Sequence, residues 1–95
     1  MQTLRSKTLT FSIGEVAKFL DRTVFWIREQ ERVGRFRTES KKLITPERTD
    51  ASKGPGQRRY TLKHIEEMAR SLHRQGVFTD GELERTLNRV EAFSH

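Results

Sequence analysis

The fold of this chain is decided by the stretch Gly56-Gln57-Arg58-Arg59-Tyr60-Thr61. It joins a basic, strand-like run to an amphipathic helix, because Thr61 can cap a helix whose apolar residues then recur at helical spacing. The apolar stripe consists of Leu62, Ile65, Met68, Ala69 and Leu72, and it ends near Gly76. The stretch therefore predicts a strand that passes directly into a helix.

Two shorter helices are predicted upstream, between Ser12 and Gly34. Ser12 and Glu15 have the spacing of a capping box at a helix start. One apolar face follows, made by Ile13, Val16, Ala17 and Leu20. Asp21 and Arg22 interrupt this pattern, and Thr23 can then cap a second helix.

The second helix is expected to have an inner and an outer face. Val24 and Ile27 are predicted to point inward, while Phe25, Arg28 and Arg32 share another face. Trp26 is expected in the core, since a large aromatic side chain supplies scarce buried area in a small domain.

The remaining elements are a hairpin and a fourth helix. Leu43 and Ile44 predict a short strand, 46–56 reads as a loop, and 57–60 returns as the second strand. Thr79 and Glu82 form another capping box, before a helix with an apolar face at Leu83, Leu87 and Val90. The expected fold class is mainly α, a winged helix-turn-helix of about four helices plus a β-hairpin wing.

Length and composition set the limits. The 95 residues fit one domain, predicted over 12–95 and preceded by an N-terminal arm over 1–11, in which Thr8 to Phe11 alternate like a strand but fit a loose tail equally well. The sequence has no cysteine, and hence no disulfide and no thiolate zinc site. Neither a membrane-spanning run nor an apolar signal core is present, so a soluble, cytoplasmic protein without membrane partners is expected.

Charge is concentrated in the middle of the chain. Residues 28–59 carry ten Lys and Arg against five Asp and Glu, a net +5, while 1–27 carry +2 and 60–95 carry −1, which together give the total of +6. A basic surface of this kind favours contact with a phosphate backbone. Double-stranded DNA is therefore the predicted partner.

These motifs together resemble the DNA-binding domain of the MerR family and of the related small phage excisionases. The resemblance lies in Ser12-Ile13-Gly14-Glu15-Val16-Ala17, in Arg28, Glu31 and Gly34, and in Gly56 to Thr61, and it covers roughly 11–90. It implies that Arg28 reads the major groove, that Arg58 and Arg59 reach the DNA backbone or minor groove, and that Tyr60 touches a phosphate.

Other contacts are weighed from the residues themselves. Glu29 can accept from a cytosine amino group or be an ordinary solvated or salt-bridged carboxylate, and Phe25 can meet a thymine methyl group. Arg32 is expected on phosphate or as solvated charge. The complete predicted DNA-binding set is Thr23, Phe25, Arg28, Glu29, Arg32, Arg58, Arg59, Tyr60 and Lys63.

The chain departs from MerR regulators in one respect. Those proteins usually continue from the fourth helix into a coiled coil and an effector domain, whereas this sequence stops at His95. The resemblance to excisionases implies an architectural factor in the bacterial host cell that binds cooperatively beside copies of itself, bends attachment-site DNA and works with an integrase in phage excision. The alternative is a small MerR-like transcriptional regulator without an effector domain.

Neither catalysis nor a cofactor is predicted. The only tyrosine, Tyr60, would need a surrounding set of Arg and His groups to act as a recombinase nucleophile, and the chain is too short to assemble one. His64 and His73 lie nine positions apart, on opposite faces of one helix, and cannot share a metal.

Overall fold

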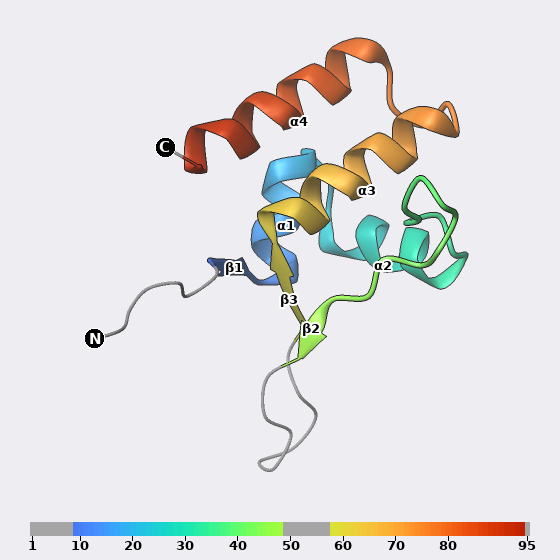
Figure 1. The fold of residues 1–95 in the computed structure, drawn as a ribbon, viewed down its shortest axis with the longest axis horizontal. Coiled ribbons are helices and arrows are strands. Elements are labelled where there is room, and N and C mark those ends of the chain that lie inside the picture. Colours follow the sequence, from blue (N-terminus) through green and yellow to red (C-terminus); the bar gives the residue numbers. More distant parts are fainter. Residues whose placement is uncertain (1–8, 49–57, 95) are drawn as a thin grey trace.

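The computed structural model describes residues 9–48 and 58–94, and they form a mainly α structure in which four helices pack around a small antiparallel sheet (Figure 1). The elements in chain order are β1 (Thr10–Phe11), α1 (Ile13–Leu20), α2 (Val24–Arg32), β2 (Glu47–Arg48), β3 (Arg58–Thr61), α3 (Leu62–Arg74) and α4 (Asp80–Phe93). No helix in these described ranges is long and apolar enough to cross a bilayer.

All four helices begin at the residues that the sequence predicts. Ser12, Thr23, Thr61 and Thr79 each accept a hydrogen bond from the backbone N–H three residues on. At Ser12 and Thr79 the glutamate at the third position returns a hydrogen bond to the cap, which completes the predicted capping boxes. At Thr61 the ring nitrogen Nδ1 of His64 takes that role.

The sheet has the order β1-β3-β2, and both pairings are antiparallel. β2 lies at Glu47–Arg48 and not at Leu43 and Ile44, as predicted. Leu43 instead forms an isolated bridge with Arg37, and the Ile44 N–H donates to the Phe36 carbonyl. These contacts fold the segment after α2 onto itself, which moves the strand a few residues further along the chain.

β1 contains the last two residues of the predicted N-terminal arm. Thr10 pairs with Thr61 and Phe11 with Tyr60, and the Phe11 ring is buried. The packed part of the chain therefore starts before residue 12, while 1–8 lie outside the described residues. Because Thr10 and Phe11 are paired within their own chain, they are not a separate strand that joins a neighbour's sheet.

The core is centred on α3. The predicted stripe Ile65, Met68, Ala69 and Leu72 is fully buried, and α1, α4 and β3 all pack against this helix. Two positions of its inner side and of α4 are polar: Ser71 and Thr86 are each 1% exposed. Trp26 is partly buried against the core and stacks on Phe78 at 6.5 Å between ring centroids, as expected for a packing role.

The turn between α1 and α2 is attached to the start of α4. Arg22 donates to the Glu82 carboxylate at 2.6 Å, and its guanidinium lies 5.2 Å from the Trp26 ring centroid and 5.0 Å from that of Phe78. A cation between two aromatic rings and a carboxylate is stabilised by both. The hydrogen bond from Arg22, together with that from the Thr79 backbone, lowers the pKa of Glu82 to about 2.

We expect the Arg22–Glu82 pair to make stability depend on pH. Because the pKa of Glu82 is about 2 in the folded state and near 4.5 ordinarily, its contribution is fully present above pH 4.5 and is lost as the pH falls toward 2. Glu82→Gln should therefore lower Tm at neutral pH, and the difference from the wild type should shrink in acid. Glu84→Gln, on the same helix, is the control. A Tm difference that stays constant from pH 7 to pH 2 would contradict this assignment.

Candidate nucleic-acid interface

One face of α2 carries four of the predicted contact residues. Phe25, Arg28, Glu29 and Arg32 recur at helical spacing, and Ile27, on the opposite side, is fully buried in the core. Phe25 is 74% exposed although it is a large aromatic residue. An aromatic ring held in solvent beside an exposed arginine marks a surface that fits a partner.

Glu29 and Arg32 form an ion pair on this face, with Nη2 and Oε1 2.8 Å apart. The hydrogen bond from Arg32 lowers the pKa of Glu29, and the same bond raises the pKa of Arg32. Of the two alternatives for Glu29, the structure thus shows the salt-bridged carboxylate. The pair is close to neutral, so the exposed Arg28 supplies the net positive charge of the face.

Tyr60 has a different place from the one that the family resemblance implies. It is 1% exposed, and its hydroxyl donates to Oε2 of Glu31 at 2.5 Å. The expectation that Tyr60 touches a phosphate is therefore corrected, since the ring packs in the core and the hydroxyl faces a carboxylate of its own chain. This hydrogen bond joins β3 to α2 and fixes the helix against the sheet.

Arg59 also makes contacts within the chain. Its guanidinium donates from Nε to Thr10 Oγ1 at 3.2 Å and from Nη2 to the Thr10 carbonyl at 3.1 Å. Arg59 thus holds β1 onto β3, and removing its side chain would disturb the sheet as well as any DNA contact. Arg58 contributes its backbone to the pairing of β3 with β2.

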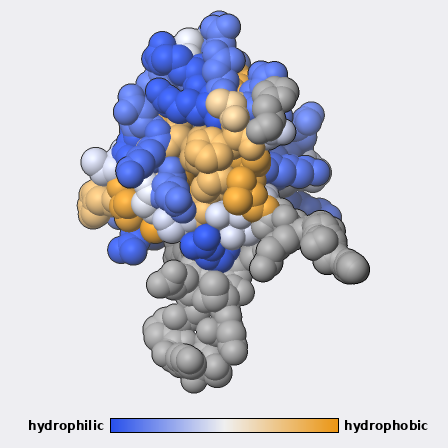
Figure 2. Space-filling view, turned by 90° about the vertical axis from the view of Figure 1, so that its left-hand side faces the viewer, coloured by the Kyte–Doolittle hydropathy of each residue, from blue (hydrophilic) through white to orange (hydrophobic). Residues whose placement is uncertain are grey.

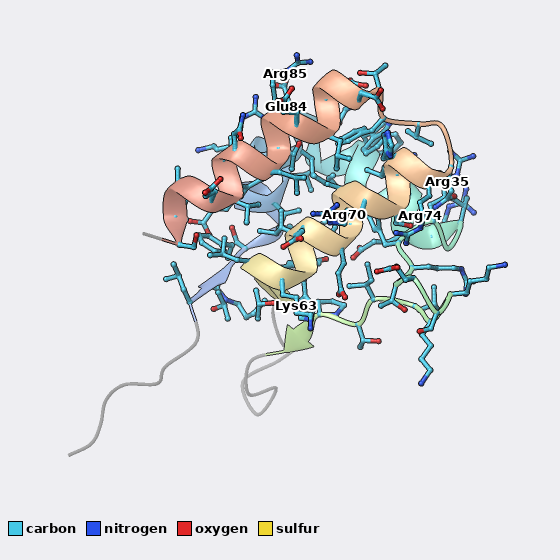
Figure 3. The ribbon with its side chains drawn as sticks, turned by 45° about the horizontal axis from the view of Figure 1, so that its top comes forward. Arg35, Lys63, Arg70, Arg74, Glu84 and Arg85 are labelled. Atoms are coloured by element: carbon cyan, nitrogen blue, oxygen red, sulfur yellow. The ribbon has the colours of Figure 1, made fainter. Side chains whose placement is uncertain are left out.

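Thr23 and Lys63 lie at the starts of two helices. Thr23 caps α2 by accepting from the Trp26 N–H at 3.1 Å and is itself exposed. Lys63 is exposed in the first turn of α3, just after the strand that continues from the hairpin (Figure 3). The predicted contact residues are therefore distributed over α2, β3 and the beginning of α3.

The basic segment that follows α2 is anchored on α3. The buried Ser71 hydroxyl donates to the Arg35 carbonyl at 2.6 Å and accepts from the Arg37 N–H at 3.1 Å. Arg74 donates to the Arg37 carbonyl at 2.9 Å, and Arg35 and Arg74 lie at the same end of the molecule (Figure 3). The exposed side chains of Arg35, Lys41 and Lys42 are carried by a segment with a fixed backbone path.

Sequence reasoning missed two pairs that position this surface. Arg22 appeared only as a break in an apolar pattern, and Glu82 only as part of a capping box. Ser71 did leave a signal, because it is a polar residue beside Leu72 within an otherwise apolar stripe. Its two partners come from a segment 34 to 36 residues away, so they were not predictable from local spacing.

Comparison with known proteins shows that the chain belongs to a family described as a domain of unknown function (DUF7229), which matches residues 6–93. No curated protein and no solved structure matches the chain.

Tyr60→Phe tests the structural role of the buried hydroxyl. It should lower the free energy of unfolding by about 1.5–3 kcal/mol, the usual contribution of a hydrogen bond to a charged group. Chemical denaturation of the wild type, Tyr60→Phe, Glu31→Gln and the double variant would measure the coupling between the two side chains. Additive losses would show that the pair does not stabilise the fold. Unchanged stability in Tyr60→Phe would restore the predicted phosphate contact.

Proposed function

We propose that this protein is a sequence-specific DNA-binding factor with a winged helix-turn-helix fold. Three features support the fold: the short turn Asp21 to Thr23 between α1 and α2, the antiparallel pair β2–β3, and the direct passage from β3 into α3. In this arrangement α2 is the reading helix and the β2–β3 hairpin is the wing.

The exposed outer face of α2 is the observation that carries the proposal. It presents the guanidinium of Arg28 and the ring of Phe25 from a rigid helix whose other side is buried. Arginine reads guanine through two acceptors in the major groove, and apolar rings contact the methyl group of thymine. Cations on the segment after α2 and at Lys63 would hold the protein on phosphates without reading the sequence.

The proposed role is that of an excisionase, an accessory factor that sets the direction of phage site-specific recombination. It rests on the sequence resemblance, together with a structure that offers a DNA-reading face and a small folded unit. Copies bound to adjacent sites would bend attachment-site DNA, at a cost of about 1–6 kcal/mol that the added protein–DNA contacts offset. The integrase would then act on the bent DNA.

Arg28→Ala and Lys63→Ala should separate reading from positioning. Arg28→Ala should cost about 1–3 kcal/mol on a specific site and much less on random DNA. Lys63→Ala should weaken binding to both DNAs alike and make the plot of log affinity against log salt less steep by about 1. Fluorescence anisotropy over a range of salt concentrations measures both effects.

Both side chains are exposed, so circular dichroism should show unchanged folding in either variant. Arg59→Ala is a poor substitute, because its side chain also holds β1. If the Arg28 and Lys63 variants lose affinity equally on both DNAs, α2 is not the reading helix.

An excision assay tests the proposed role itself. A plasmid that carries the two product attachment sites of an integrated phage, incubated with the cognate integrase, should be resolved only when this protein is added. Arg28→Ala should abolish that stimulation, and Lys42→Ala, an exposed cation elsewhere, should weaken it less. Specific DNA binding without any effect on excision would favour the transcriptional regulator instead.

A further inference from the structure

An apolar groove lies at the end of the molecule where β1 and α4 meet, away from the outer face of α2. Three rings form its floor and wall: Phe11, Phe19 and Phe93 have centroids 5.1 to 5.4 Å apart. Phe11 and Phe19 are buried, but Phe93 is 55% exposed. Figure 2 shows the resulting hydrophobic patch on this side of the molecule.

The border of this groove is positively charged. Lys18 of α1 and Arg89 of α4 line it together with Glu15. The Glu15 carboxylate accepts the Ser12 N–H at 2.8 Å in the capping box, which lowers the pKa of Glu15. Lys18 is exposed, and Arg89 is held in place by donating to the Phe19 carbonyl at 2.7 Å. A partner with carboxylates around an apolar side chain would therefore complement the groove.

The other flank of α4 has that chemistry. Leu83 and Leu87 line a shallow apolar depression beside Asp80 and Glu84. Asp80 is almost fully exposed, and Glu84 points outward from α4 (Figure 3). This acidic face thus combines two leucines with two exposed carboxylates, which matches the aromatic groove and its two cations.

The two surfaces lie on opposite sides of one helix. Asp80 and Arg89 are nine positions apart, which at about 100° per residue is two and a half turns. A molecule therefore cannot satisfy its own groove, and a contact between the groove of one copy and the acidic face of the next leaves one free surface of each kind. Such a heterologous contact repeats instead of closing.

We propose that copies of this chain associate head to tail, with the acidic leucine face of α4 docking in the aromatic groove of the next copy. The groove volume of about 270 Å³ is small for a ligand site and suits one or two side chains. Opposite charge on the two faces fixes the direction of the contact. The proposal rests on the proposed function only in that DNA would align the copies, because the contact itself involves no DNA-reading residue.

Sedimentation velocity of the protein alone, from micromolar to millimolar concentration, tests this contact. The wild type should show a mass that grows continuously with concentration. Lys18→Glu places a carboxylate opposite Glu84, and Glu84→Lys places an ammonium group opposite Lys18, so each should weaken self-association roughly tenfold or more. Lys42→Glu makes the same charge change on another exposed site and is the matched control.

Mixing the two variants supplies the decisive measurement. Each groove then meets an oppositely charged face on the other variant, so an equimolar mixture should regain association that neither variant shows alone. Phe93→Ala should weaken association without any charge change. A monomeric wild type at millimolar concentration, a mass that saturates at a dimer, or a mixture without recovery would each overturn the proposal. Affinity for a single DNA site should be unchanged in Glu84→Lys, so failure of the contact and failure of DNA binding are separate results.

Discussion

The hydrogen bond between the buried Tyr60 hydroxyl and Glu31 is the constraint on which the rest of the structure depends. Tyr60 lies in the central strand of the sheet and immediately before the residue that caps α3, while Glu31 lies in the last turn of α2. One side chain therefore ties the sheet, the central helix of the core and the outermost helix together. A buried polar group without a partner costs about 1–3 kcal/mol, so the two residues stabilise the fold only in this arrangement.

A second attachment acts at the other end of α2. Arg22, in the turn before the helix, reaches the carboxylate of Glu82 and covers two aromatic rings, and this joins the turn to α4. With Tyr60 holding its last turn and Arg22 its beginning, α2 has a fixed orientation although only Ile27 among its residues is fully buried. The exposed face with Phe25 and Arg28 is then presented rigidly, which is what a helix that reads base edges requires.

The small size of the domain explains why it carries apolar surface at its periphery. A chain of 95 residues has few core positions, so aromatic residues such as Trp26 and Phe93 are covered on one side only. Trp26 is completed by Phe78 and Arg22 from its own chain. Phe93 contacts Phe11 and Phe19 but keeps half of its surface in solvent, and the proposed contact with another copy would cover it.

The sequence by itself determined where the helices begin and which of their faces are apolar. Capping boxes and helical stripes are interactions between residues three or four positions apart, so Ser12, Thr23, Thr61 and Thr79 could be recognised without knowledge of the fold. The tertiary structure alone decided the partners of Tyr60, Arg59 and Arg22, because each contacts a residue 29 to 60 positions away. It also placed β2 at Glu47–Arg48 instead of Leu43 and Ile44, since a two-residue strand is defined by its hydrogen bonds to β3 and has almost no local preference of its own.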